Sequence, residues 1–390
     1  MNDETDVIHQ LFGVNRTKFV DAFLGKQHLH SAMNETGLLA KSLPCPDAFA
    51  RLLSLSAVNS NDVQLTANGQ PVRTPLLSSG ALDLQMIWSQ FYDGTSIVMN
   101  NLQKIDASVS DMCSALFTSL GHRLGANAYL TPPGAAAFAT HFDTHDVIVV
   151  QVAGEKQWSL FNRPDEVPVQ YHHQLKLEAS VLEAKPLANT MLKAGDALYL
   201  PRGFPHRAKT ESDVSLHVTF SLKPIDLAYV LQSAADMLRH SDEAFREQIS
   251  PNLFLNVAAM PKPESLQRLC ETISNPEFMA RLMQAVRKEA IQGERLSITP
   301  LYCMNAQHPT AVRWRVDSYV EMQELPDESL VVTNGVKATK FVGDEIDIFR
   351  RVRGGQESAT APISLNSENA ARIRVLQRLS ALGLVEPINA

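Results

Sequence analysis

The sequence predicts a mainly β domain, then a helical domain, then a small α+β unit such as a winged helix. Short apolar segments separated by turn residues fill the region from about 124 to 222, and many short strands with regular turns favour a sandwich or a barrel. Apolar residues recur at helical spacing from 223 to about 297, and alternating segments return from about 298. We therefore expect domains over residues 1–222, 223–297 and 298–390.

The first 120 residues show a mixed α and β pattern. Apolar spacing predicts helices at 15–24, 46–55 and 108–120, and the branched, apolar run GTSIVMNNL predicts a strand at 94–102. The clearest strands come next, in the segments ANAYLT, DVIVVQVA, KQWSLF, DALYLP and VSLHVTFS. Gly154 and Gly195 punctuate this region as turns.

The last of these strands has two different faces. One face carries the polar residues, and the opposite face carries apolar residues. The polar row is Ser215, His217, Thr219 and Ser221, and the apolar row is Val214, Leu216, Val218 and Phe220. In a barrel the polar row can line a ligand cavity, whereas on an exposed sheet it would face water.

The remaining residues carry helical stripes and then short strands. Residues 223–297 hold no candidate site residue, so we expect them to form a dimerisation domain; the alternative is that the stripes pack only within one chain. One such stripe is Leu227, Leu231, Ala234 and Leu238. In the tail we expect strands at 312–322, 329–334 and 337–342, and a helix over 369–382 that Ser367 caps and Gly383 ends.

Composition limits the classes of function. The chain has 390 residues, 45% of them hydrophobic, and a formal charge of −7, which argues against a broad basic surface that coats nucleic acid. The four cysteines are scattered without a CxxC pair, which fits a reducing compartment. The first residues, MNDETDVIHQLFG, lack the basic start and apolar run typical of a signal peptide, and no apolar run approaches about 18 residues. We expect a cytoplasmic protein with no membrane span and no direct contact to nucleic acid.

One motif in the central segment THFDTHDVIVV carries metal chemistry. His141 and Asp143 are two residues apart, so on an extended strand both side chains point to one face. With His206, from the segment AGDALYLPRGFPHRAKT, they would complete a set of two histidines and one carboxylate, which leaves open positions on non-haem Fe(II). A bare HxD occurs often by chance, so the second histidine is decisive.

Other histidines compete for this role. His145 would add a further ligand on the same short segment, where the facial geometry is poor. His217 lies on the polar row and could reach the cavity. His172 and His173 lie in a polar loop, where we expect them to be solvated.

The residues around the motif resemble a known family. The run GANAYLTPPGAAAFATHFDTHDVIVVQVAGEKQWSLF, together with LYLPRGFPHRAKT and SLHVTFS, closely resembles the JmjC ribosomal oxygenases, which include a bacterial arginyl hydroxylase and human nucleolar histidyl hydroxylases. The match is specific over about 121–222. It implies a double-stranded β-helix of the JmjC/cupin kind, a homodimer formed through the helical domain, and a winged helix at the end.

The resemblance also implies roles for single residues. Lys156, fifteen residues after His141, would bind the distal carboxylate of 2-oxoglutarate; a cation inside a barrel is costly unless an anion meets it. The alternative is a solvated turn lysine in GEKQ. Tyr129, His217 and Thr219 would also contact the co-substrate. Asn127, Tyr129 and Ser221 would surround the substrate side chain. One position departs from the family: the strand GTSIVMNNL has Val98 where a polar or basic residue that contacts the substrate is expected in one human relative.

Together these observations predict an Fe(II)-dependent dioxygenase that uses 2-oxoglutarate and O2 as co-substrates. The expected reaction hydroxylates a side chain of a protein or peptide substrate, such as a ribosomal protein, with histidine favoured over arginine. The alternatives are a hydroxylase of a biosynthetic peptide or small molecule on the same fold, a demethylase, and a non-catalytic cupin-like binding protein.

Overall fold

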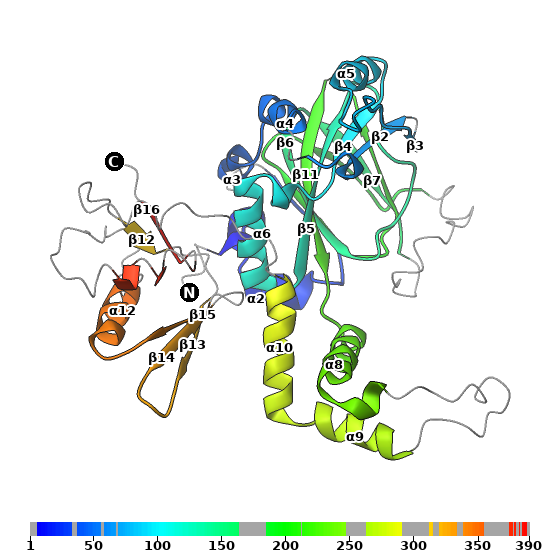
Figure 1. The fold of residues 1–390 in the computed structure, drawn as a ribbon. Coiled ribbons are helices and arrows are strands. Elements are labelled where there is room, and N and C mark those ends of the chain that lie inside the picture. Colours follow the sequence, from blue (N-terminus) through cyan, green and yellow to red (C-terminus); the bar gives the residue numbers. More distant parts are fainter. Residues whose placement is uncertain are drawn as a thin grey trace. The chain divides into compact units, whose positions relative to one another are not determined.

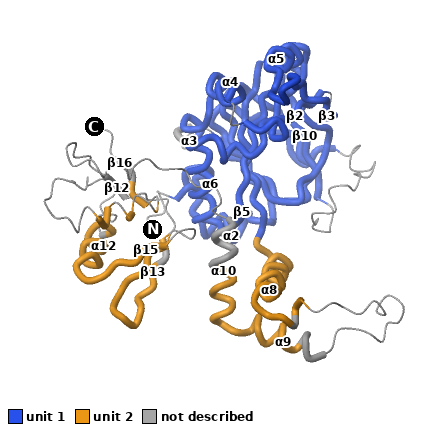
Figure 2. Tube along the Cα trace, viewed as in Figure 1, with its two compact units in different colours: residues 1–224 blue, residues 225–390 orange. Residues whose placement is uncertain are grey.

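The structure is a computed structural model in which the chain divides into two compact units, residues 1–224 and 225–390 (Figure 2). The residues described are 6–32, 37–55, 58–67, 69–163, 185–211, 213–246, 263–290, 312–314, 320–333, 338–354, 374–376, 378–379, 382 and 384–387. Within them, no helix combines the length and the apolar character that a membrane crossing requires.

The first unit is built on two antiparallel sheets (Figure 1). The large sheet has the strand order β1-β9-β6-β11-β5-β4-β2-β3, and the small sheet has the order β10-β7-β8. The strands of the large sheet are β1 (Leu29–Ser31), β2 (Val63–Ala67), β3 (Gln70–Val72), β4 (Ser96–Met99), β5 (Arg123–Thr131), β6 (Asp146–Ala153), β9 (Ala197–Leu200) and β11 (Ser215–Lys223). Those of the small sheet are β7 (Lys156–Leu160), β8 (Ala188–Leu192) and β10 (His206–Thr210).

Helices from the first part of the chain share one core with the large sheet. They are α1 (Val7–Phe12), α2 (Arg16–Ala22), α3 (Gly37–Ser42), α4 (Pro46–Leu53), α5 (Leu84–Tyr92) and α6 (Ala107–Leu120), with single turns of 3-10 helix at Ser60–Asp62 and Leu102–Lys104. Phe19, Phe49 and Leu116 from these helices join Val218 and Phe220 of β11 in that core. The apolar face of β11 is therefore buried against the helices, as the alternation predicts.

A second, smaller apolar core lies between the two sheets. Val147 and Val149 of β6 pack there with Trp158 and Leu160 of β7, while the intervening Ile148 belongs to the larger core. Strand β6 is thus buried on both faces, which explains its nearly continuous apolar sequence. Val214, which the alternation assigned to the apolar face, instead precedes β11 and is 39% exposed.

The expected helices at 15–24, 46–55 and 108–120 are present as α2, α4 and α6. Their caps explain their bounds: the side chain of Asn15 accepts a hydrogen bond from the Lys18 N–H, and that of Asp106 accepts one from the Val109 N–H. Helix α6 ends at Gly121, which has a left-handed backbone. The short elements α1, α5, β1, β2, β3, β8 and β10 were not anticipated, because segments of three to nine residues give weak periodic signals.

The second unit contains helices and short strands. Helix α8 (Leu227–Ser241) packs with α10 (Pro276–Ala290) through Ala234 and Leu282, and α9 (Pro263–Ile273) precedes α10. A 3-10 turn covers Glu243–Arg246. The strands are β13 (Glu321–Glu324), β14 (Leu330–Thr333) and β15 (Ala338–Phe341), which form a meander, and β12 (Val312–Trp314), which pairs with β16 (Val385–Pro387); helix α12 spans Asp344–Gly354.

Only parts of the expected C-terminal helix can be compared. Residues 374–376 and 378–379 are helical, while Ser367 and Gly383 lie outside the described residues. Val375, Leu376 and Leu379 share a core with β14, β15 and α12. Strands beside a compact helical core agree with the α+β character expected here, and the winged-helix assignment stays a prediction.

Gly154 offers a test of how tightly the barrel is built. Its φ is +65°, and an added Cβ would lie 2.1 Å from the carbonyl oxygen of Val214. We expect Gly154→Ala to lower the free energy of unfolding by about 3 kcal/mol, because strain and steric overlap add. Gly134→Ala is the control: it has φ +70° but nothing within 4 Å, so about 1 kcal/mol should be lost. Equal losses in denaturant unfolding would contradict the close approach.

Candidate metal centre and cavity

A cavity of about 230 Å³ opens between the two sheets of the first unit. Both sheets contribute to its wall, together with the segment that precedes β6. The lining residues are Tyr129, Ala137, Phe138, His141, Asp143, Val147, Val149, Lys156, Trp158, His206, Ala208, His217 and Thr219. Most of the candidate residues therefore share one mainly apolar cavity, which is the setting typical of a small-ligand site.

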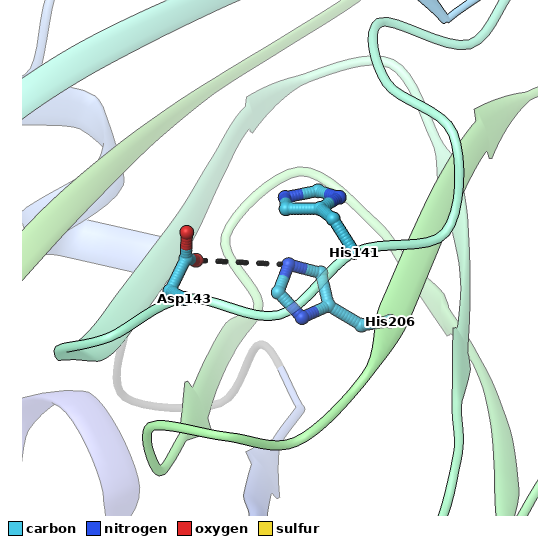
Figure 3. A group of neighbouring side chains, drawn as sticks. All are labelled: His141, Asp143 and His206. Atoms are coloured by element: carbon cyan, nitrogen blue, oxygen red, sulfur yellow. Dashed lines mark ion pairs between the residues drawn. The ribbon is translucent and has the colours of Figure 1, made fainter. Parts of the chain in front are cut away.

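His141, Asp143 and His206 come together in this cavity (Figure 3). One potential ligand atom from each residue lies within 4.8 Å of the others, and Nε2 of His206 is 3.8 Å from Oδ2 of Asp143. The backbones of His141 and His206 exchange two hydrogen bonds, of 2.7 and 3.1 Å. This isolated bridge places the two imidazoles side by side, with ring centroids 4.5 Å apart.

The expected strand position of the HxD pair is wrong in detail. His141 and Asp143 lie in the segment before β6, which begins only at Asp146. His206 is the first residue of β10. An isolated bridge joins His141 to His206, so the HxD segment meets β10 at this one pair of residues.

Hydrogen bonds fix which imidazole nitrogen faces the metal position. Nδ1 of His141 lies 2.9 Å from the carbonyl oxygen of Ala139, and Nδ1 of His206 lies 2.9 Å from that of Phe204. A carbonyl oxygen only accepts, so each Nδ1 donates and each Nε2 keeps its lone pair. Burial, and next the neighbouring His141, lowers the pKa of His206, which favours the neutral form that a metal requires.

The donor set fits a non-haem iron. Two neutral imidazoles and one carboxylate on one side of a metal leave positions open for other ligands. His145 and His217 are outside the cluster of three, and burial lowers the pKa of each of them. His172 and His173 lie outside the described residues.

Lys156 is the cation that lines the cavity in the described part of the chain. Its side chain is 1% exposed, so it is not a solvated turn lysine. Its Nζ donates to Oγ1 of Thr131 at 2.8 Å and lies 3.4 Å from Nδ1 of His217. None of the ion pairs found among the described residues involves it, and burial lowers its pKa to about 7. A buried cation that meets only neutral groups is costly, and an anionic ligand would remove that cost.

Aromatic rings connect the lysine to the metal ligands. The rings of Tyr129 and His217 stack with centroids 4.7 Å apart, and the Trp158 ring stacks on His206 and meets His217 edge-on. Burial, and next the charge of Asp143, raises the pKa of Tyr129 to about 12. Tyr129 is therefore a neutral phenol that can donate a hydrogen bond in the cavity.

Two of the expected substrate residues do not line the cavity. Oδ1 of Asn127 accepts the N–H of Asn101 at 3.2 Å, and Oγ of Ser221 donates to the carbonyl of Gly125 at 3.2 Å. Both lie on the strands that carry Tyr129 and Thr219. Val98 is fully buried on β4 opposite Tyr129.

Sequence reasoning missed three residues that shape the site. They are Thr131, which contacts Lys156, and the ring residues Phe138 and Trp158. Thr131 follows Tyr129 by two positions and Trp158 follows Lys156 by two, so strand alternation places each on the cavity face. That signal was available for these two, whereas Phe138 lies in an irregular segment without a period.

Comparison with known proteins agrees with this geometry. The family model described as "JmjC domain" matches residues 99–229. The chain is 38% identical over 213 residues to "Ribosomal oxygenase 1" of Danio rerio, and 32% identical over 205 residues to "Bifunctional lysine-specific demethylase and histidyl-hydroxylase NO66" of Dictyostelium discoideum. Residues 99–229 are thus similar to a JmjC domain, and about half of the chain is similar to ribosomal oxygenases.

The extent of these matches differs between sequence and fold. Each alignment covers 52% of this chain, but only 37% of the Danio protein and 40% of the Dictyostelium protein. The crystal structure of the Escherichia coli ribosomal oxygenase YcfD matches 96% of this chain and 98% of its own length, with a TM-score of 0.58 and 15% identity. At that identity the likeness concerns the fold, which is a JmjC, cupin-like β domain with the further elements of a YcfD-like chain.

Lys156 makes the stability of the metal-free protein depend on pH. Its pKa is about 7 in the folded chain, against 10.5 ordinarily, so between these values the unfolded chain binds more protons. The free energy of unfolding of the wild type therefore rises with pH between about 7 and 10.5 because of this lysine. We expect Lys156→Met to be more stable than the wild type at pH 7, with the advantage shrinking by pH 10. Urea unfolding at both pH values measures the difference in stability between the variant and the wild type. For the exposed Lys209→Met control this difference should not change with pH. A difference that is also constant for Lys156→Met would contradict the prediction.

Proposed function

We propose that the protein is an Fe(II)- and 2-oxoglutarate-dependent oxygenase that hydroxylates a side chain of a protein substrate. The observation that carries this proposal is the presence, in one cavity, of an open triad of metal ligands and a buried lysine without an anionic partner. Supporting it, a structure of YcfD was determined in complex with cobalt and 2-oxoglutarate (TM-score 0.56, 15% identity). The fold and the donor chemistry are thus compatible with this co-substrate.

The chain's own residues would divide the work between two regions of the cavity. His141, Asp143 and His206 would hold Fe(II) through Nε2, a carboxylate oxygen and Nε2. Bound iron, with 2-oxoglutarate and O2, supplies an oxidation that yields succinate, CO2 and a hydroxylated substrate. Lys156 would pair with the distal carboxylate of 2-oxoglutarate. The neutral Tyr129 would donate to the same co-substrate, and His217 and Thr219 would line its path.

The apolar wall serves the same chemistry. Val147, Val149 and Trp158 line the cavity beside the polar groups, so water is limited and each charge interaction is strengthened. A dicarboxylate would satisfy Lys156 and the metal at the same time. Because the cavity offers both a cation and a metal, it favours a small dianion over a neutral metabolite as the co-substrate.

The substrate that we propose is a polypeptide, with histidine favoured over arginine. The relatives are named as a ribosomal oxygenase and a histidyl-hydroxylase. Of Asn127, Tyr129 and Ser221, which lie on neighbouring strands β5 and β11, Tyr129 lines the cavity, and its phenol could hydrogen-bond an imidazole near the iron. The formal charge of −7 also favours a basic partner such as a ribosomal protein.

The metal and co-substrate roles can be separated by two substitutions. Lys156→Ala should raise the KM for 2-oxoglutarate about tenfold or more, because a charge-assisted hydrogen bond contributes about 1.5–3 kcal/mol, while iron affinity changes little. Asp143→Ala removes the only carboxylate of the triad, so succinate formation should disappear in a protein that still folds. An unchanged KM in the first variant would refute the role of Lys156; Arg202 and Arg207, the other nearby cations, do not line the cavity.

Mass spectrometry can identify the substrate class. Purified protein with Fe(II), 2-oxoglutarate and O2 would be offered histidine-containing and arginine-containing ribosomal peptides, free amino acids and methylated lysine peptides. We expect one oxygen to be gained on a peptide side chain, with the histidine peptide favoured. Loss of a methyl group would indicate demethylation, and oxidation of a free small molecule alone would overturn the polypeptide substrate.

We also propose that the helical segment 223–297 mediates a homodimer. Leu227 and Leu231 of α8 are 72% and 42% exposed, although Ala234 and Leu238 of the same stripe are buried. We expect light scattering at micromolar concentration to give twice the 43.0 kDa chain mass. Leu227→Asp combined with Leu231→Asp should shift the mass to that of the monomer, and a monomeric wild type would exclude the dimer.

A further inference from the structure

The two segments that carry the metal ligands are joined by more than the His141–His206 bridge. The N–H of Gly203 donates to the carbonyl oxygen of Asp143 at 2.9 Å. The two segments thus run antiparallel across the triad. We call this series of hydrogen bonds the ladder, although its register shifts by one residue and only the His141–His206 contact is a β-bridge. The ladder spans the whole triad and continues beyond it.

In the next hydrogen bond of the ladder, the acceptor is a side chain instead of a backbone carbonyl. Oδ1 of Asp146 accepts the N–H of Arg202 at 3.0 Å. Oδ2 of the same carboxylate accepts the hydroxyl of Tyr199 at 2.5 Å. Asp146 is 4% exposed and Tyr199 is 0% exposed, so these hydrogen bonds satisfy groups that water does not reach.

Tyr199 in turn connects this carboxylate to the N-terminal helices. Its hydroxyl oxygen accepts the N–H of Gly25 at 2.7 Å, and its ring meets Phe19 of α2 edge-on with centroids 4.9 Å apart. Tyr199 is near the end of β9, four residues before Gly203, whose N–H donates to the Asp143 carbonyl, and seven residues before His206. The phenol therefore sits between a rigid core and the loop 201–205.

We propose that Asp146 and Tyr199 are positioning residues that hold the loop 201–205, and through it His206, at the distance from His141 and Asp143 that a divalent metal requires. This inference rests on the proposed function, because it takes the triad to be a metal site. With the Tyr199 hydroxyl removed, Oδ2 of Asp146 loses its donor and the carboxylate is free to turn away from Arg202. The loop then loses a tether, and Nε2 of His206 samples a wider range of positions.

The expected effect is on metal affinity. Loss of a group that orients a metal ligand typically weakens metal binding by about 10–100-fold. Lys156 and Thr131 are not part of the ladder, so binding of 2-oxoglutarate at saturating metal should change little. A purely structural pair would instead lower the unfolding temperature and leave the metal affinity of the folded protein unchanged.

The experiment measures Co(II) binding by calorimetry and the visible absorption of the Co(II) protein, at a temperature where every variant is folded. The variants are Tyr199→Phe, Asp146→Asn and the double variant. Tyr199→Phe keeps the ring and the charge of Asp146. The control is Ser159→Ala, which removes a partly buried hydrogen bond of the same unit, 2.8 Å from Ser159 Oγ to Asn189 Oδ1, on strands that do not carry the ladder.

We expect Tyr199→Phe and Asp146→Asn each to weaken Co(II) binding about tenfold or more and to alter the absorption bands. The loss of Co(II) affinity in the double variant should be smaller than the product of the two single losses, because both substitutions break the same contact. Ser159→Ala should bind like the wild type. At saturating Fe(II), the KM for 2-oxoglutarate should stay within about twofold of the wild-type value in all variants. Loss of a direct contact to the co-substrate would raise this KM about tenfold.

Each other outcome overturns the inference. Wild-type Co(II) affinity and spectrum in folded Tyr199→Phe would show that the pair is only structural. Weak binding in Asp146→Asn alone would show that the charge of Asp146 acts without positioning. If the wild type binds no Co(II), or keeps its Co(II) affinity when Asp143 is replaced by alanine, it is the proposed metal site that fails.

Discussion

Two backbone hydrogen bonds between His141 and His206 are the constraint on which the site depends. They join a segment that leads into β6 of the large sheet to the start of β10 in the small sheet. Without them the two imidazoles would belong to separate sheets, and the carboxylate of Asp143 would have no second histidine to face. The same contact closes the space between the sheets at one point, so the cavity and the cluster of donors arise together.

The remainder of the cavity is organised around an unfavourable charge. Lys156 occupies a fully buried position and is met by Thr131 and His217, neither of which is an anion. A buried cation without an anionic partner lowers the free energy of unfolding. Proteins commonly retain such unfavourable groups where they bind a ligand. The apolar neighbours Trp158 and Val149 increase the cost of this buried charge, and an anionic ligand would offset that cost.

The sequence allowed the main features of the first unit to be predicted because they have local signals. The strand pattern of β11, the caps of α2 and α6 and the HxD motif are all visible within a few residues. The pairing of His206 with His141 is a contact across 65 residues, and the resemblance to a family, not the local pattern, selected it. Short edge strands such as β1 and β3 have too few residues for a period to appear.

Other features depend on tertiary structure and have no sequence signal. Asp146 follows the motif closely, but its role depends on Tyr199 and Arg202, which are more than 50 residues away. The absence of Asn127 and Ser221 from the cavity wall also could not be read from the strands, because strand alternation gives the face of a residue but not its depth. The separation of the helical and C-terminal segments into two domains stays a prediction.

Strand order has a consequence for how this chain acquires its structure. Strand β11 is the last strand of the first unit in the sequence, yet it lies inside the large sheet between β6 and β5 (Figure 1). It carries cavity residues on one face and core residues on the other. Until residue 223 has left the ribosome, β5 and β6 each present an unpaired edge, and the cavity lacks a wall. Folding that must wait for such distant pairings is slow, so the nascent chain has a long interval in which its open sheet edges need protection from association.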